Sequence, residues 1–340
     1  MEAHIASNLL TGLLIMLAVV AWLGARRNPL WRRAGRELLR RRPVAVSVVL
    51  LYALVAALDS IAWIDTPAAD AEGLVGVPRS VIDRFFPEDF QEASYSAPFA
   101  SAELYGGEPL RHPGAHVLGT DIIGRDVLHR ALKGSRVALI IGGFTSLIVV
   151  PLALLVGMSA GYVGGRLDDV IFFVMSTLAS MPSLLLLIAL IMVLGVGTFQ
   201  VCLALGVTGW VGLARLLRAE TLKIRELDYV DAARVLGTPE PIIVWRHVLP
   251  NLMHLVVISF ALLFSSLVLS EVVLSWLGIG IEGSWGRMID QARTELSREP
   301  LIWWNILAAS AALFGLILAV NQVADAVRDI LDPRTLSEGA

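Results

Sequence analysis

Residues 228–251 read DYVDAARVLGTPEPIIVWRHVLPN, a polar stretch set between long apolar runs. Residues 226–236 carry good helix formers and no Gly or Pro, and Gly237 then supplies a helix stop. Pro239 and Pro241 forbid a simple continuation of that helix but suit the first turn of a new one. The stretch therefore predicts a helix, a sharp turn and a second helix.

The side chains of this helical pair favour a contact surface. Ala232 and Ala233 are small enough to let another surface approach closely. Larger side chains are candidates for burial in a partner's groove, namely Tyr229, Leu236, Ile242 and Ile243. The alternative is an ordinary amphipathic connector between two apolar spans.

The composition places the chain in a membrane. Hydrophobic residues make up 56% and charged residues 17%, and the mean hydropathy is +0.72, so too little charge is present to cover a water-facing surface. A crossing needs about 20 apolar residues to span about 30 Å of hydrocarbon. The sequence predicts an all-α membrane protein with candidate spans at residues 5–24, 44–64, 137–161, 170–195, 201–214, 252–281 and 301–324.

Two features of the apolar pattern set the topology. The uncharged run 170–214 is too long for one crossing, and the sequence Gly195–Gln200 is its natural break. Residues 1–4 have no basic residue and the Arg block at 26–42 follows the first span, so we expect that span to be a reverse-oriented anchor and not a signal peptide. If the N-terminus lies outside and the spans alternate in direction, most Lys and Arg residues fall in the inside segments. We therefore expect the N-terminus outside and the C-terminus inside. The Arg block is also suited to contact anionic lipid.

Residues 65–136 are the one candidate domain outside the membrane. They are rich in Pro, Ser, Ala and acidic residues, which indicates a small extracytoplasmic lobe packed against its own spans, or a partly ordered loop. Its aromatic residues are too few for a large independent core: Phe85, Phe86, Phe90, Tyr95, Phe99 and Tyr105.

The lobe ends in a second informative string, HVLGTDIIGRDVLHR at residues 116–130. Gly119 and Gly124 allow tight backbone turns, while Asp121, Arg125 and Asp126 can pair with one another or cap the helix that follows. Together with Thr120 these residues form a compact candidate motif.

Both strings carry a family resemblance. Asp231, Ala232 and Ala233, then Gly237, then His247, Leu249 and Pro250 resemble the signature loop of permease subunits of ATP-binding cassette importers, which docks on a separate ATPase. The string LGTDxxGRDVL resembles the one that precedes the second core helix in dipeptide and oligopeptide permeases of the C type. Shorter stretches agree at residues 161–169, 180–182, 274–286 and 328–334, so the resemblance covers about residues 43–336.

This resemblance implies a six-span permease core with one extra N-terminal helix. The implied organisation is an extra helix with an Arg-rich linker at 1–42, a first core span at 43–64, the lobe at 65–136, a core at 137–324 with an ATPase-coupling loop at 215–250, and a cytoplasmic tail at 325–340. Tyr229 belongs to the implied coupling residues. Asp231 replaces the Glu that is usual in the signature loop, and the linker 282–283 is shorter than expected.

The resemblance also implies a function in the bacterial inner membrane. The chain would form a path for peptides together with a second permease. Its further partners would be two ATPase subunits, an extracytoplasmic solute-binding protein and membrane lipid, but no nucleic acid. The same scaffold also serves import of nickel, opines or another small solute. From other classes, an ion-coupled secondary transporter or channel and a purely structural membrane scaffold are the alternatives.

No catalytic constellation is visible in the sequence. The lysines are Lys133 and Lys223, and neither completes the phosphate loop Gly-x4-Gly-Lys-[Ser/Thr], so ATP and Mg²⁺ are expected on partner subunits. The six His residues show no metal-ligand spacing, and Cys202 is alone. We therefore expect a transport subunit, not an enzyme, without a cofactor or metal of its own.

Two acidic residues fall inside candidate spans, where charge is costly. Asp59 and Glu271 both lie near the predicted outer ends, where headgroup water could solvate them. Glu271 is the candidate for the translocation path, because the family often carries an acidic residue just before its Leu-Ser-x-Leu-Gly string.

Overall fold

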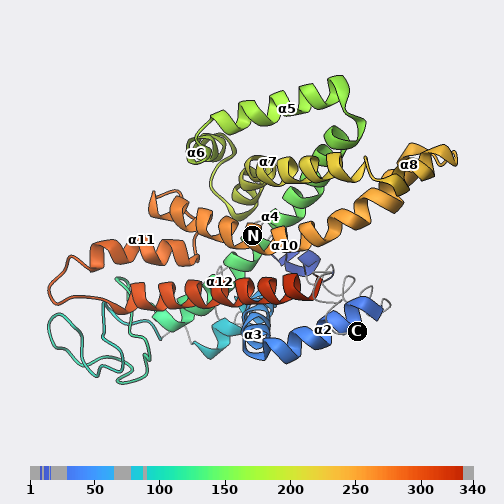
Figure 1. The fold of residues 1–340 in the computed structure, drawn as a ribbon. Helices are drawn as coiled ribbons and strands as arrows, with labels where there is room; N and C mark the ends of the chain where they lie inside the picture. The colour runs from blue at the N-terminus through green and yellow to red at the C-terminus, as the bar shows by residue number, and fades with distance from the viewer. Residues whose placement is uncertain are drawn as a thin grey trace. The chain divides into compact units, whose positions relative to one another are not determined.

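The computed structural model describes residues 8–9, 11–14, 16, 29–64, 78–86 and 90–331 (Figure 1). Within these residues, five helices are long and apolar enough to cross a membrane, and a bent helix pair makes a sixth if it counts as one span. Most of the first predicted span, 5–24, lies outside the described residues. So does the end of the tail, 332–340.

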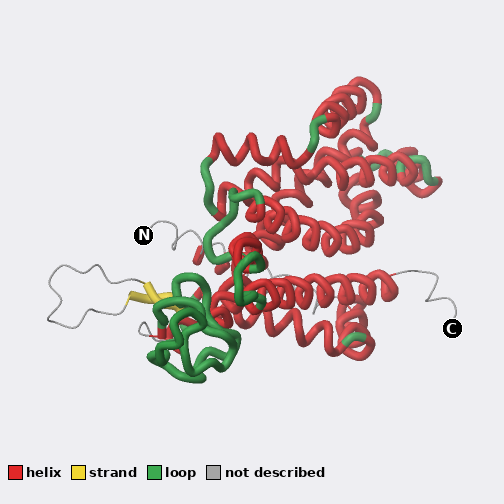
Figure 2. The backbone as a smooth tube through the Cα atoms, turned by 90° about the vertical axis from the view of Figure 1, so that its left-hand side faces the viewer, coloured by secondary structure: helices red, strands yellow, loops and turns green. Residues whose placement is uncertain are grey.

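Helices make up nearly all regular structure in the described part of the chain (Figure 2). The helices are α2 (Pro29–Arg41), α3 (Pro43–Ser60), α4 (Val127–Val163), α5 (Gly165–Ser180), α6 (Ser183–Leu194), α7 (Thr198–Ile224), α8 (Asp228–Val235), α9 (Glu240–Ile243), a π-helical segment (Val244–Val248), α10 (Leu249–Trp276), α11 (Trp285–Glu295) and α12 (Trp304–Leu331). A short 3₁₀ helix spans Ile82–Phe85. Strands β1 (Ala62–Ile64) and β2 (Pro78–Ser80) pair antiparallel, with Trp63 opposite Arg79.

Five predicted spans correspond to single helices, namely α3, α4, α7, α10 and α12. Helix α4 is longer than its predicted span, because it begins at Val127 in a charged stretch that a hydropathy pattern cannot assign. Its 37 residues correspond to about 55 Å of helix, well beyond the about 30 Å of hydrocarbon.

The predicted span 170–195 is a bent pair of helices and not one straight helix. Helices α5 and α6 are bent by 90° relative to each other at their junction. Pro182 disfavours a helical conformation at the residue before it, and Met181 accordingly adopts extended backbone angles. The expected break after this run is confirmed: α6 ends at Leu194, and Gly195 has a φ of +87°.

The chain divides into two compact units. Unit 1 comprises Met1–Arg27, Val44–Ile141 and Val268–Ala319, and unit 2 comprises Asn28–Pro43, Gly142–Leu267 and Val320–Ala340. Divisions fall inside α4, α10 and α12, so these helices contribute residues to both units, and another falls after Pro43, the first residue of α3.

In unit 1, the described lobe residues 90–126 pack on the unit's own helices. The Trp304 indole N–H donates to the Thr120 carbonyl at 2.9 Å, and the Tyr95 hydroxyl donates to Glu295 at 3.2 Å. Trp285 is buried and donates to the Ala131 carbonyl at 2.8 Å. The expected packing of the lobe against its own helices is thus confirmed for these residues.

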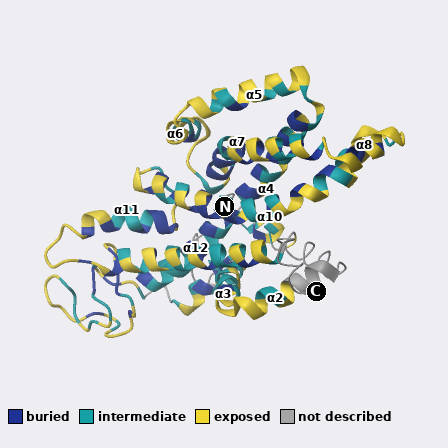
Figure 3. Ribbon diagram, viewed as in Figure 1, coloured by how far each residue is buried: buried dark blue, intermediate teal, exposed yellow. Residues whose placement is uncertain are grey.

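In unit 2, small residues let α4 and α7 approach closely. A methyl group on Gly157 would lie 2.6 Å from the Ala214 carbonyl oxygen, and one on Gly161 would lie 2.7 Å from the Arg218 carbonyl oxygen. Such close helix contacts through small residues four apart are typical of membrane helices. The apolar core beneath them joins α4, α5, α7, α8 and the start of α10 (Figure 3).

Candidate functional site

The helix-turn-helix predicted around Gly237 is present in unit 2. Helix α8 ends in a Schellman motif, in which Thr238 N–H donates to the Ala233 carbonyl at 3.1 Å and Gly237 N–H donates to the Arg234 carbonyl at 3.0 Å. Gly237 has a φ of +78°, which a residue with a Cβ adopts only at a cost. Pro239 precedes α9, and its carbonyl accepts from the Ile242 and Ile243 N–H groups. The chain therefore reverses direction within a few residues.

Helix α9 continues into α10 through the π-helical segment. Pro250 lacks an N–H and its ring crowds the carbonyl four residues earlier, so a regular α turn is disfavoured just before it. The Leu249 N–H instead bonds to the Val244 carbonyl, five residues back. Asn251 then donates to the His247 carbonyl at 2.6 Å and to the Tyr229 hydroxyl at 3.0 Å. This amide ties α8 to α10, a link that no sequence pattern indicated.

A second brace holds the turn from the side. Arg234 donates to Asp231 at 2.7 Å and to Glu240 at 3.1 Å, so it bridges α8 and α9. The Tyr162 hydroxyl, at the end of α4, donates to the other oxygen of Glu240. Hydrogen bonds to Tyr162 and Glu240 raise the pKa of Arg234 above its ordinary value. Each of these ion pairs is exposed and weak, but together they fix the angle between the two short helices.

One face of the pair is buried in the core of unit 2. Val230 and Ala233 of α8, and Ile243 and Val248 after the turn, are all buried there. This corrects two expectations, because Ile243 is not available as an anchor for a partner and Ala233 does not lie on an open surface. Both side chains are used to hold the helix-turn-helix on its own core.

The opposite face is apolar and exposed. Val235, Leu236 and Trp245 are 86%, 84% and 73% exposed, and Tyr229 and Ile242 are about half-exposed. We call these five side chains the platform. A braced, exposed apolar surface of this kind is typical of a docking site for another protein. Ala232 and Asp231 lie exposed beside it, and His247 is partly buried with its ring 6.3 Å from that of Tyr229. Leu249 and Pro250 begin α10 behind it.

The motif at residues 119–126 belongs to unit 1 and is built differently. Asp121 is fully buried and accepts hydrogen bonds from the N–H groups of Ile123 and Arg125 and from the side chains of Arg125 and Arg130, all at 2.8–3.0 Å. Asp126 caps α4, because its carboxylate accepts from the His129 N–H at 2.9 Å. The predicted pairing and capping by these residues are confirmed.

Both glycines of the motif are required by close backbone approach. Gly119 and Gly124 have φ values of +72° and +77°. A methyl group would lie 2.5 Å from the Ser96 carbonyl oxygen at Gly119, and 1.9 Å from the Glu92 carbonyl oxygen at Gly124. Thr120, fully buried, accepts from the Ser96 N–H at 2.7 Å. The motif thus determines the shape of the lobe.

A buried cluster beside the motif was not foreseen from sequence. The His116 ring lies 2.9 Å from Asp126 and 3.4 Å from Glu92, and all three groups are buried. Burial alone would lower the pKa of His116, but its contacts with Asp126 and Glu92 raise it above the ordinary value. Burial opposes ionisation of Glu92, yet the N–H groups of Arg111 and His112 hold its pKa below the ordinary value.

The two acidic residues in the spans are not solvated by headgroup water, contrary to expectation. Asp59 is buried, accepts from Ser80 at 2.9 Å and lies 3.5 Å from both Lys133 and Arg136. Glu271 is 4% exposed and accepts from the Ser275 hydroxyl at 2.6 Å. Asp59 has partners on neighbouring elements of unit 1, whereas the partner of Glu271 lies one turn along the same helix, so both carboxylates serve packing in this chain. A role for Glu271 on a transport path stays a prediction.

Groups that hold a metal are not found among the described residues: no three His, Cys, Asp or Glu side chains meet there with suitable geometry. Cys202 is buried in α7.

Apolar crossing helices, together with an exposed platform held on a rigid turn, define a multi-pass membrane protein that works with other subunits. Residues 153–337 match the family model of the binding-protein-dependent transport system inner membrane component. The chain belongs to this family, and it is a transport subunit of the inner membrane, not an enzyme.

Three relatives show how far the likeness extends. The oligopeptide transport system permease protein OppC of Haemophilus influenzae is 28% identical over 90% of this chain and 89% of its own length. The glutathione transport system permease protein GsiD of Pectobacterium atrosepticum is 32% identical over 72% and 82%. The dipeptide transport system permease protein DppC of Bacillus subtilis is 35% identical over 64% and 69%.

Proposed function

We propose that the chain is a permease subunit of an ATP-driven importer of peptides. The relatives are named for oligopeptides, dipeptides and glutathione, itself a tripeptide, which favours short peptides as the cargo class. A second permease would complete the path, two ATPase subunits would bind ATP and Mg²⁺, and an extracytoplasmic binding protein would deliver the cargo. The N-terminus would lie outside and the C-terminus inside.

The observation that carries the proposal is the platform. Its three most exposed side chains, Val235, Leu236 and Trp245, project from a turn that Arg234, Glu240 and Asn251 brace. A surface that is both apolar and rigid transmits force, because a partner that pushes on it displaces α8 and α9 as one body. Tyr229, Asp231, Ala232, Ala233, Gly237, His247, Leu249 and Pro250 are the proposed coupling residues. Ala233 serves from the buried side.

Movement would reach the membrane through the helices that leave the turn. Helix α7 is joined to α8 by three residues. After the turn, α9, the π-helical segment and α10 run on without a loop to Trp276. ATP-driven closure of the ATPases would move the turn, and the attached spans would expose the path outward. No bond in the cargo is broken by this chain, since its work is conformational.

A reconstituted complex tests the proposal. In liposomes with all partner subunits, the ATPase rate should rise with short peptides and binding protein, and uptake should stop when the partner ATPase loses its phosphate-loop Lys. The chain purified alone should hydrolyse no ATP. If nickel or an opine stimulates the ATPase and peptides do not, that solute is the cargo in place of peptides. Uptake that survives loss of the ATPase and collapses with an ionophore would establish a secondary transporter instead.

A further inference from the structure

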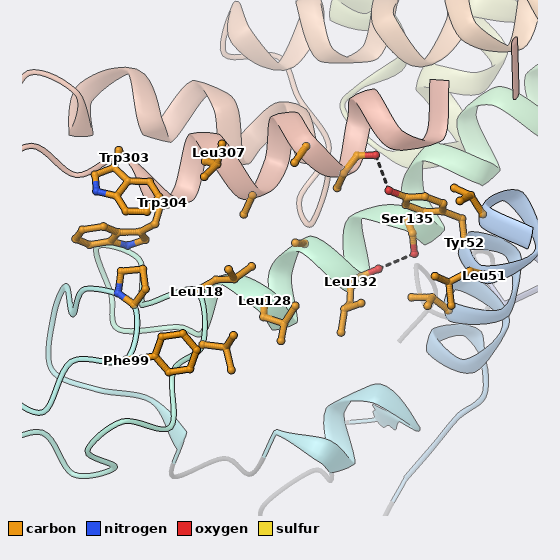
Figure 4. A pocket seen from close by; sticks show the side chains of 18 residues that line it. Leu51, Tyr52, Phe99, Leu118, Leu128, Leu132, Ser135, Trp303, Trp304 and Leu307 are labelled. Carbon is orange, nitrogen blue, oxygen red and sulfur yellow. Dashed lines mark hydrogen bonds between the residues drawn. The ribbon is translucent and has the colours of Figure 1, made fainter. Parts of the chain in front are cut away.

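A deep cavity of about 730 Å³ lies within unit 1 (Figure 4). Its walls come from α3, the first turns of α4, the first turns of α12 and two lobe segments near residues 98–99 and 117–118. The lining is almost wholly apolar, with Leu51, Leu128, Leu132 and Leu307 as its main side chains. This volume lies within the range of protein cavities that hold small ligands.

Three side-chain donors around the cavity are already used by the protein. The Tyr52 hydroxyl donates to the Ala312 carbonyl at 2.8 Å, the Ser135 hydroxyl to the Leu132 carbonyl at 2.6 Å, and the Trp304 indole to the Thr120 carbonyl at 2.9 Å. A peptide backbone placed here would lose its water and gain few partners, which is costly. The cavity therefore suits an occupant without polar groups and is not suited to the peptide cargo.

One side of the cavity continues into the apolar surface that faces the membrane. Leu51 and Leu307 line the cavity and are 57% and 55% exposed, and Leu50 and Leu54 beside them on α3 are equally exposed. Because α3 and α12 are both membrane-crossing helices, this surface meets lipid tails. Trp303 and Phe99 lie at one end of the cavity, with Leu51 and Tyr52 at the other. Half-exposed Trp side chains are typical of headgroup depth.

We propose that this cavity binds one acyl chain of a membrane phospholipid. The chain enters at the Trp303 end and extends between α3, α4 and α12 toward Tyr52. Lipid tails are as apolar as leucine, so the hydrophobic effect alone does not favour a tail in the cavity over a tail in the bilayer. The shape of the cavity supplies this preference. A single helical turn, about 10 Å across, fills about 420 Å³, so the cavity is too small for a crossing helix of a partner, with its about five turns. The Trp303 end adjoins lobe residue Phe99, so the phospholipid belongs to the outer leaflet in the orientation proposed above.

Photolabelling of the whole importer tests this inference. The complex is reconstituted in phosphatidylethanolamine and phosphatidylglycerol vesicles that contain phosphatidylethanolamine with a diazirine at the end of one palmitoyl chain. After irradiation, mass spectrometry should find label at Leu51 and Leu132, toward the Tyr52 end, several-fold above that at Val193, an exposed residue of α6. Ala308→Phe, which fills the cavity, should abolish this excess, whereas Ser310→Phe, on the same helix but outside the lining, should preserve it.

Three results would overturn the inference. These are equal labelling of Val193 and the cavity residues, an unchanged excess in Ala308→Phe, or products in which a photoreactive amino acid at position 132 is joined to residues 1–28 or to another subunit. The Ser310→Phe variant and the elution profile of each complex control for misfolding. Peptide-stimulated ATP hydrolysis is measured in the same vesicles, so failure of the lipid site and failure of the proposed function are told apart.

Discussion

The lobe and the platform each contain a sequence motif, but they place its residues in opposite ways. In the lobe, charged and polar groups such as Asp121, His116 and Asp126 are buried and paired within the chain. In the platform, apolar groups such as Val235 and Leu236 are exposed, and nothing in the described part of the chain covers them. A buried polar group whose partners lie in the same chain is accounted for by the fold alone. An exposed apolar group on a rigid support needs a second molecule to explain it.

The largest effect is expected from breaking the lobe. Asp121→Ala leaves the Arg130 guanidinium, largely buried, without its carboxylate partner, and the loss of one member of a buried ion pair costs about 3–5 kcal/mol. Thermal unfolding of the purified complex should shift strongly downward, and proteases should cut the lobe. Glu108→Ala, at an exposed lobe position, is the control and should be silent. A stable Asp121→Ala complex would show that the lobe does not depend on this network.

Changes in the platform should weaken binding of the ATPase without affecting the folding of this chain. In Val235→Asp/Leu236→Asp, charge replaces the two most exposed apolar side chains of the platform, and loss of a central contact weakens an interface by about 2 kcal/mol or more, which is about 30-fold. Copurification with the ATPase should fail at unchanged thermal stability. Leu167→Asp, exposed at the start of α5, is the matched control and should keep the ATPase. Normal copurification by the double variant would remove the platform from the docking site.

Gly237 tests the turn that supports the platform. A methyl group there would meet no atom within 4 Å, so Gly237→Ala imposes backbone strain only, at about 1–2 kcal/mol. Gly237→Val adds a β-branched side chain and should reduce peptide-stimulated ATP hydrolysis further, while membrane insertion is kept. Full activity in both variants would mean that the left-handed conformation at this turn is dispensable.

The smallest effect is expected from pH. The pKa of His116 is raised in the folded lobe by Asp126 and Glu92, against the effect of burial. Its protonated ring therefore stabilises the lobe fully below about 6.5, the unfolded value, and this contribution is lost as pH rises through the folded pKa. The unfolding temperature of the wild type should fall more between neutral and alkaline pH than that of His116→Gln. Parallel curves for the two proteins would contradict the prediction.

The sequence predicts the spans and the turn because these depend on local patterns. Apolar runs locate α3, α7, α10 and α12, and Gly237 with Pro239 locates the turn. Long-range partners leave no such pattern. Glu92 and His116 are 24 positions apart, and Tyr229 and Asn251 are 22 apart, with no periodicity to join them. Helices α8 and α9 are also too short for their inner and outer faces to be told apart, which is why Ile243 and Ala233 are placed wrongly.

The bend between α5 and α6 has a consequence for the life of the newly made chain. With 16 and 12 residues, neither helix crosses the bilayer alone, and Phe173, Met192 and Val193 stand more than 60% exposed on the pair. An apolar helix pair that is too short to cross depends on lipid and partner subunits to cover it, and a subunit left without its partners is what cellular quality control acts on. Synthesised without its partners, the subunit should be short-lived. Its abundance in the cell would then follow the supply of the subunits that join it, which matches production of the parts without a dedicated regulator.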